Sequence, residues 1–143
     1  MPYQITLEEK ASAEDIAVLG DGLDRFVSDL FPGKRYTSVA FFLRDDAGKI
    51  VGGVHGNYGS FGWLYVSALW VTEELRGKGY GTRLLAKIEA EAARHGCTKV
   101  FLQTFSFEAP AFYEKLGYTI FAELEDFPPG HSRLFLRKTL ELG

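Results

Sequence analysis

The chain has 143 residues, of which 46% are hydrophobic and 24% are charged. This composition is typical of a globular protein, and the length suits one domain of ordinary size, so we expect a single domain over residues 1–143. The net charge of -3 argues against a general nucleic-acid-binding surface, and no apolar run approaches the roughly 20 residues that a membrane-spanning helix needs.

The N-terminus and the cysteine content predict a cytoplasmic protein. Residues 1–5 lack the basic start and the long apolar core of a signal peptide. Cys97 has no second cysteine in the chain with which to form a disulfide, and no spacing of cysteine or acidic residues predicts a metal site. We therefore expect no metal and no binding to membranes or nucleic acid.

The first part of the chain predicts an edge strand and then a helix. Residues 4–8 alternate polar and apolar side chains, as an edge strand does. Ser12 is suited to cap a helix with an acidic first turn, and apolar residues then recur at three- and four-residue steps to about Phe31. Two glycines weaken the middle of this pattern, so it fits one helix or a broken pair.

Residues 38–71 predict three antiparallel strands. Residues 38–44 and 49–58 flank a turn-forming segment at residues 45–48 and should form a hairpin. The apolar run Trp63–Val71 follows without a long crossover, so we expect it to extend an antiparallel meander.

The second half of the chain alternates helices and strands. Residues 84–93 place apolar side chains on one helical face, and His95 lies where it can interact with the C-terminal end of the helix dipole. The apolar run at residues 100–104 completes a strand–helix–strand crossover, so it should lie parallel to Trp63–Val71. A short helix and two strands are then predicted at residues 108–116, 118–123 and 133–139.

The strongest motif stands between a predicted strand and a predicted helix, and it is Arg76-Gly77-Lys78-Gly79-Tyr80-Gly81-Thr82. Alternate glycines let the backbone turn its N–H groups toward one point, and the following helix adds unpaired N–H groups and the positive end of its dipole. The motif therefore predicts a phosphate cradle. It is not a Walker loop, which requires Gly-Lys-Ser/Thr, and it lacks the third glycine of a dinucleotide fingerprint.

The pattern Arg-x-x-Gly-x-Gly, on Arg76, Gly79 and Gly81, resembles the acyl-CoA pyrophosphate loop of the GNAT (GCN5-related N-acetyltransferase) family. The segment Ala111-Phe112-Tyr113-Glu114-Lys115-Leu116-Gly117-Tyr118 resembles a late helix of the same family. The resemblance covers about residues 36–140. It implies an α/β fold with a mixed, largely antiparallel sheet, flanked by helices, in which a splayed parallel strand pair holds acetyl-CoA as the co-substrate.

The resemblance also implies roles for residues near the cofactor. Tyr113 would be the general acid that returns a proton to the departing thiolate, because a phenol with a pKa of about 10 can protonate a thiolate held within hydrogen-bond reach. Leu69, Trp70 and Val71 would supply main-chain groups, freed by a bulge, that pair with the pantetheine arm and polarise the thioester carbonyl. With residues 76–82, they form the predicted acetyl-CoA site.

The general base is less well defined. An amine must lose a proton before it attacks, and many members of the family have a glutamate six residues ahead of the position matching Val71, where this chain has Tyr65. Tyr65, through a water relay, and His131, whose imidazole lies in a Pro-Gly loop, are candidates. Further candidates are His55, Glu123 and Asp126.

A second departure from the family pattern is Phe107, which stands where many members have an asparagine that contacts CoA. This ring and five others are candidates for an aromatic acceptor pocket that would favour an amphipathic or cationic amine. The other rings are Trp63, Tyr65, Tyr58, Phe61 and Phe105. We expect at least half of the six to be core residues instead.

The favoured function is N-acetylation of a primary amine of a small molecule by direct attack on acetyl-CoA, in a homodimeric enzyme. Acetylation of a protein or peptide N-terminus or lysine is the first alternative. A non-catalytic acyl-CoA-binding module is the second, and it would tolerate the loss of Tyr113. A third is nucleotide binding by a Rossmann-like domain, which would bind NAD or ATP rather than CoA.

Overall fold

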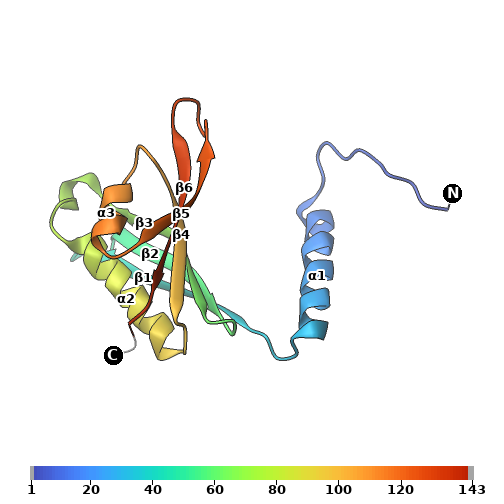
Figure 1. Ribbon diagram of the computed structural model, residues 1–143, viewed down its shortest axis with the longest axis horizontal. Coiled ribbons are helices and arrows are strands. Elements are labelled where there is room, and N and C mark those ends of the chain that lie inside the picture. The colour runs from blue at the N-terminus through green and yellow to red at the C-terminus, as the bar shows by residue number, and fades with distance from the viewer. Residues whose placement is uncertain (1, 142–143) are drawn as a thin grey trace. The chain divides into compact units, whose positions relative to one another are not determined.

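The computed structural model of the chain describes residues 2–141 (Figure 1). Backbone contacts divide it into two units, Met1–Lys34 and Arg35–Gly143, which are described separately. A single domain over residues 1–143 therefore stays a prediction.

The first unit contains one helix, α1 (Ala13–Leu30). The side chain of Ser12 accepts a hydrogen bond from the backbone N–H of Asp15 at 3.0 Å, which confirms the predicted N-cap. The helix runs unbroken through both of its glycines. The strand expected at residues 4–8 is absent from the described chain, because alternation alone forms a strand only where a partner strand supplies the hydrogen bonds.

The second unit is built on one six-stranded sheet with the order β1-β2-β3-β4-β6-β5. All neighbouring strands are antiparallel except β3 and β4, which are parallel. This arrangement confirms the mixed, largely antiparallel sheet. The strands are β1 (Tyr36–Arg44), β2 (Ile50–Gly59), β3 (Trp63–Val71), β4 (Lys99–Phe105), β5 (Thr119–Glu125) and β6 (Ser132–Thr139).

Two helices, α2 (Tyr80–Arg94) and α3 (Pro110–Lys115), lie on the same side of this sheet (Figure 1). The predicted apolar face of α2 is buried in the core. It consists of Leu84, Leu85, Ile88 and Ala92, and it packs with sheet residues that include Leu64, Val66, Val100, Leu102 and Leu136. Burial of this face, rather than intrinsic helix propensity, is what stabilises α2 on the sheet.

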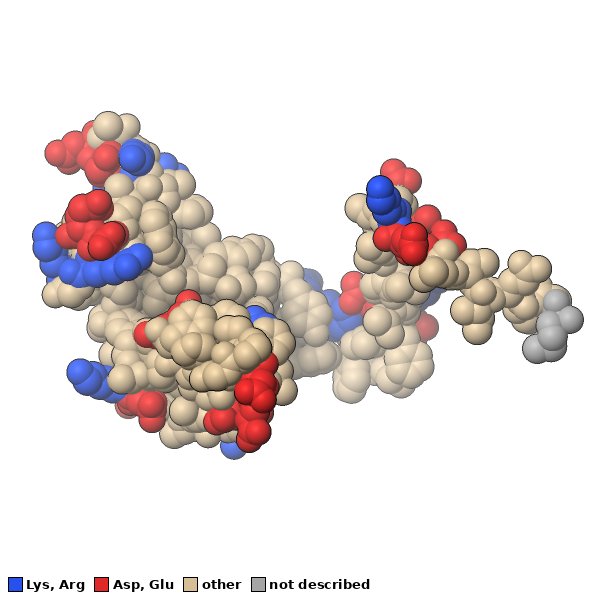
Figure 2. All heavy atoms as spheres, turned by 90° about the horizontal axis from the view of Figure 1, so that it is seen from above, with Lys and Arg blue, Asp and Glu red and all other residues tan. Residues whose placement is uncertain are grey.

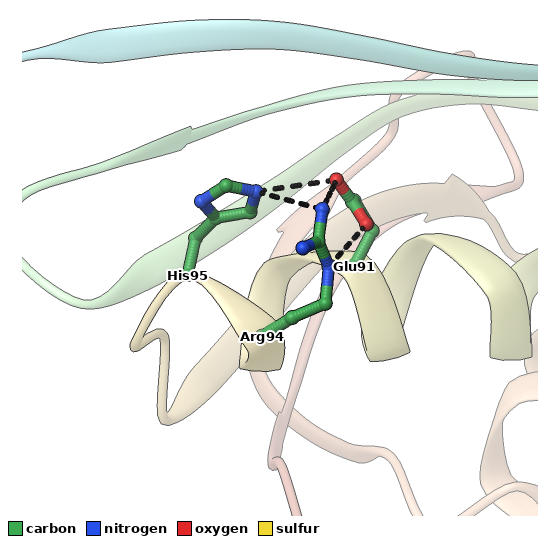
Figure 3. Close-up of polar contacts among 3 residues, drawn as sticks. All are labelled: Glu91, Arg94 and His95. Atoms are coloured by element: carbon green, nitrogen blue, oxygen red, sulfur yellow. Dashed lines mark hydrogen bonds and ion pairs between the residues drawn. The ribbon is translucent and has the colours of Figure 1, made fainter.

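The C-terminal end of α2 is held by side-chain contacts (Figure 3). The guanidinium of Arg94 donates to the Glu91 carboxylate at 2.9 and 3.1 Å, and Nε2 of His95 lies 3.2 Å from the same carboxylate. The His95 ring also stacks on Tyr58, with 4.9 Å between centroids. The hydrogen bond from Arg94 lowers the pKa of Glu91. These contacts fix the His95 ring at the C-terminal end of α2, where its role is structural.

Figure 2 shows acidic and basic side chains interspersed among uncharged ones on the face that it displays. No helix within residues 2–141 is long and apolar enough to cross a membrane. Over the same residues, no three His, Cys, Asp or Glu side chains gather in a way that would hold a metal ion.

Candidate active site

The parallel strands β3 and β4 separate at one end of the sheet. They pair from Trp63 to Val66 on β3, and the last partner on β4 is Leu102. Beyond this point β3 keeps its hydrogen bonds to β2 and β4 keeps those to β6. The edges that face each other, residues 67–71 and 103–105, therefore diverge and form a splayed parallel pair, as the resemblance implies.

A β-bulge marks the residue at which the strands part. His55 of β2 pairs with Ala68, whereas Gly56 pairs with Val66, so Ser67 is an extra residue in β3. A bulge of this kind bends the strand and leaves one residue outside the regular ladder. Here it turns the end of β3 away from β4.

The position of the bulge follows from the contacts of Ser67 and from the absence of a side chain at Gly56. The Ser67 hydroxyl donates to the carbonyl of His55 at 3.0 Å and lies 2.7 Å from Nδ1 of the same residue. Gly56 makes room for the bulge, because a Cβ there would collide with the carbonyl oxygen of Tyr65. The bulge lies two residues before the Leu69–Val71 segment in which we expected it, since the contact that fixes it is a side-chain contact across strands.

The glycine motif follows β3 through a short 3₁₀ helix, Glu73–Leu75. Nε of Arg76 donates to the carbonyl of Val71 at 3.2 Å, which ties the loop to the end of β3. Gly77 and Gly79 have φ values of 76° and 87°, a conformation that favours glycine. Two of the three alternate glycines thus adopt the conformation for which the motif was singled out, whereas Gly81 lies within α2.

The loop leaves the start of α2 accessible to an anion. Gly79 is the N-cap of α2, so no side chain caps the first N–H groups of the helix, and its first turn contains no acidic residue. A Cβ added at Gly77 or Gly79 would meet no atom within 4 Å. At Gly81 it would lie 3.4 Å from Cζ of Phe112, so the helix start packs close to α3. This geometry fits a pyrophosphate held by main-chain N–H groups.

Tyr113 projects from α3 and is half-buried. Its ring makes edge contacts with Phe112 and Tyr118, with centroids 5.1 and 5.7 Å apart. Burial raises the pKa of Tyr113, and the negative charge of Glu108 raises it further. The phenol therefore keeps its proton at neutral pH, which is the state that a general acid requires.

Glu108 is a residue of this region that the sequence reasoning missed. Its carboxylate accepts hydrogen bonds from the backbone N–H of Phe105 at 2.9 Å and from the Thr104 hydroxyl at 3.5 Å. It thus joins the end of β4 to the segment that leads into α3, and its charge acts on Tyr113. One local feature could have identified it: a glutamate three residues after the end of a strand can reach back to a main-chain N–H.

The candidate bases Tyr65 and His131 lie apart from each other. Tyr65 alternates with two residues that are buried beneath α2, so its ring faces the other side of the sheet, where it stacks on Phe101 at 4.8 Å. His131 is exposed between β5 and β6, and its ring meets the edge of Phe107 at 5.0 Å. Within the described residues, no hydrogen bond or ring contact joins Tyr65, His131 and Tyr113.

His55 is hydrogen-bonded at both ring nitrogens. Nδ1 faces the Ser67 hydroxyl at 2.7 Å, and Nε2 faces the Ser38 hydroxyl at 2.9 Å. Because the Ser67 hydroxyl donates to the His55 carbonyl, its oxygen is placed to accept from Nδ1–H. The contacts at both nitrogens fix the orientation of the imidazole beside the bulge.

The other two candidate bases, Glu123 and Asp126, make hydrogen bonds within the β5–β6 hairpin. Glu123 accepts a hydrogen bond from the Ser132 hydroxyl at 2.9 Å. Asp126 has a positive φ of 53°, and its carboxylate accepts from the Gly130 N–H at 3.4 Å. Both contacts shape the hairpin.

The six rings considered for an acceptor pocket do not form one pocket. Tyr58 stacks on His95, and Phe61 makes an edge contact with Tyr36. Trp63 and Tyr65 both contact Phe101. The remaining two, Phe105 and Phe107, stack on each other with centroids 5.1 Å apart. Together with residues of the β5–β6 hairpin they form what we call the hairpin cluster, which consists of Phe105, Phe107, Phe127, His131 and Arg133.

A cavity of about 940 Å³ has Trp63 in its lining, but its lining includes neither the glycine motif nor Tyr113. Glu89 in its wall accepts hydrogen bonds from the Tyr118 hydroxyl at 2.6 Å and from Nζ of Lys138 at 2.9 Å. Burial and the bond to Glu89 raise the pKa of Tyr118. This network joins α2 to β6 and to Tyr118, the residue directly before β5, and its role is structural.

Comparison with known proteins gives one consistent family. A model of the acetyltransferase (GNAT) family matches residues 8–118. The blasticidin-S acetyltransferase of Streptomyces morookaense is 40% identical over 102 residues, which cover 71% of this chain and 74% of that protein. The crystal structure of an acetyltransferase from Bacillus cereus has a TM-score of 0.84 and 33% identity, and the match covers 94% of this chain and 98% of the other.

A more distant match shows the fold alone. A Bacillus anthracis protein, solved in complex with acetyl coenzyme A, has a TM-score of 0.64 and 18% identity. The match covers 73% of this chain and 63% of that one.

Proposed function

Since the chain belongs to the acetyltransferase (GNAT) family and is an acetyltransferase, we propose that it transfers the acetyl group of acetyl-CoA to a primary amine of a small molecule by direct attack. The observation that carries this proposal is the splayed pair of β3 and β4, with the glycine motif at the start of α2 following directly on β3. A relative named for acetylating blasticidin-S supports a small-molecule acceptor. A cytoplasmic location and a homodimer stay predictions.

In this proposal the main chain binds the co-substrate. The N–H groups at residues 77–82 hold the pyrophosphate of acetyl-CoA, and Arg76 and Lys78 add positive charge beside it. The diverging edge of β3, which includes Leu69, Trp70 and Val71, pairs with the pantetheine arm. Strand-like pairing of this kind gives hydrogen-bond partners to the backbone groups of β3 that no longer pair with β4.

Tyr113 supplies the proton for the leaving group. The acceptor nitrogen bonds to the carbonyl carbon of the acetyl group, the bond between that carbon and sulfur breaks, and Tyr113 gives its proton to the sulfur. The nitrogen loses its own proton to a base or to a water that leads to one. Tyr65 and His131 are two candidates for this base, and the oriented imidazole of His55 beside the bulge is the third.

The first test measures acetyl-CoA binding by calorimetry and the release of CoA thiol with a panel of amines. Thr82 is exposed in the first turn of α2. Thr82→Glu places a carboxylate where the helix dipole favours it for folding, and where it repels a pyrophosphate. We expect acetyl-CoA to bind at least about tenfold more weakly to this variant, whereas the neutral control Thr82→Gln should stay within about threefold of the wild type.

The two readouts separate the alternatives. Binding without turnover of any amine would favour a non-catalytic acyl-CoA-binding module. A folded wild type that does not bind acetyl-CoA would overturn the proposal. Equal binding by Thr82→Glu and Thr82→Gln would show that the pyrophosphate does not lie at the start of α2.

A further inference from the structure

Arg133 forms no ion pair with an acidic side chain in the described part of the chain. Its guanidinium carbon lies 5.1 Å from the ring centroid of Phe105 and 5.0 Å from that of Phe127. Within residues 2–141, the guanidinium makes no hydrogen bond or ion pair with another residue. Arg133 is half-buried, and no buried polar side-chain atom of the described chain lacks a partner, so its N–H donors are accessible from solvent.

The strand register places Arg133 at the end of the sheet where β3 and β4 diverge. Arg133 of β6 is the direct partner of Phe105, the last residue of β4. Phe105 also lies on the edge that diverges from β3, and its backbone N–H is bonded to Glu108, whose charge acts on Tyr113. Phe105 therefore links the hairpin cluster to Glu108, and through Glu108 to the proposed general acid Tyr113.

The contacts within the cluster decide which charge it can bind. Arg133 lies over one face of Phe105 and one face of Phe127, so a cationic amine that approached those faces would meet a positive charge. A guanidinium stacked on rings keeps its N–H donors in its own plane, where they match the two oxygens of a carboxylate. Phe107 and His131, both exposed, add ring surface beside it.

We propose that the hairpin cluster is the acceptor-specificity site, and that it binds a carboxylate of the acceptor through Arg133. The acceptor is then an amine that also carries a carboxylate, with an apolar or aromatic body that lies against Phe107 and His131. This inference rests on the proposed acetyl transfer and names its substrate class. It replaces the expectation of an aromatic pocket for an amphipathic or cationic amine with that of a site for a molecule that has charges of both signs.

The test uses two probes with the same body, para-aminomethylbenzoate and para-aminomethylbenzamide, which differ only in the carboxylate. Binding is followed by NMR through the Nε–H signal of Arg133 and by calorimetry. We expect the benzoate to shift this signal and to bind at least about tenfold more tightly than the benzamide. Arg133→Gln should abolish the preference, and Arg133→Lys, which keeps the charge without the planar fork, should retain part of it.

Arg137 provides a matched control. Arg137 lies on the same strand, and its guanidinium carbon is 5.3 Å from the ring centroid of Phe121. It is four residues farther along β6 from the end at which β3 and β4 diverge. Arg137→Gln removes a comparable arginine–ring contact and should leave the benzoate preference unchanged. Thermal unfolding of each variant confirms that it is folded.

Equal binding of the two probes, no binding of either, or an unchanged preference in Arg133→Gln would overturn the proposal. These outcomes do not depend on turnover. If acetyl-CoA fails to bind while the benzoate preference and its loss in Arg133→Gln are observed, the acetyl-transfer proposal fails and the carboxylate site stands. If amines are acetylated with no such preference, the carboxylate site alone fails.

Discussion

The Ser67 hydroxyl bonds both the carbonyl and the imidazole of His55, at 3.0 and 2.7 Å. One serine thus fixes the bulge in β3 and orients a titratable ring on the neighbouring strand. Because the bulge is also where β3 leaves β4, the same contact links the shape of the proposed acetyl-CoA site to a candidate general base.

The first prediction concerns His55 as the base. The acceptor amine must lose a proton, and the His55 imidazole, held by both ring nitrogens beside the bulge, is placed to accept it. We expect His55→Gln to lower kcat by about 10² while the Kd for acetyl-CoA changes by less than about threefold. His131→Gln should retain most of the wild-type kcat. A loss of kcat in His131→Gln together with wild-type turnover by His55→Gln would assign the base to the hairpin instead.

The second prediction concerns Tyr113. Tyr113→Phe removes the proton donor and preserves the ring that packs on Phe112 and Tyr118. We expect kcat to fall by about 10²–10⁴ while the Kd for acetyl-CoA, measured by calorimetry, changes by less than about threefold. Phe112→Leu, which changes the packing of α3 against the start of α2 without removing the phenol, is the control for indirect effects. Wild-type turnover by Tyr113→Phe would exclude the acid role.

The third prediction uses the charge of Glu108. This carboxylate disfavours the phenolate of Tyr113 and so raises its pKa, after the larger effect of burial. Neutralising it in Glu108→Gln should lower the pKa of Tyr113, so the loss of activity at high pH should begin at a lower pH than in the wild type. Glu114→Gln, an exposed change on α3, is the control. An alkaline limb that does not move would mean that Tyr113 does not control it.

The fourth prediction concerns stability at high pH. The pKa of Tyr118 is raised in the folded protein, so Tyr118 favours folding below the unfolded tyrosine pKa of about 10, and this contribution is lost as the pH rises toward the folded pKa. Tyr118→Phe breaks the hydrogen bond to Glu89 and should lower the free energy of unfolding by about 1–3 kcal/mol at neutral pH.

Urea unfolding between about pH 9 and 11 measures both effects, and Tyr3→Phe, at an exposed site, is the control. Above the unfolded tyrosine pKa, the stability of Tyr118→Phe should decline less steeply with pH than that of the wild type. Equal slopes would contradict the buried, protonated state of Tyr118.

The fifth prediction tests the bulge. Gly56→Ala would place a Cβ against the carbonyl of Tyr65 and close to Ile88, so we expect a loss of more than about 2 kcal/mol in the free energy of unfolding. Gly20→Ala, in α1 with no atom within 4 Å of the new Cβ, should instead stabilise the protein by about 0.5–1 kcal/mol. A harmless Gly56→Ala would show that the strands can shift to admit a side chain.

The sequence by itself determined the features that depend on a few consecutive residues. The cap at Ser12, the strand Trp63–Val71, the buried face of α2 and the positive φ values of Gly77 and Gly79 all follow from local spacing and from what single residues allow. The motif that led to the family is of this kind, because a main-chain anion site needs a particular backbone more than particular side-chain partners.

The tertiary structure alone decided the features that depend on strand register. The bulge at Ser67 rests on a contact with a residue 12 positions away, and the pairing of Arg133 with Phe105 joins strands separated by α3 and β5. Local pattern also predicted a strand at residues 4–8 that the described chain lacks, and it could not decide which of the six candidate rings lie together. Side chains on different strands meet only when pairing sets their alignment, and a shift of one residue turns every side chain to the other face of the sheet.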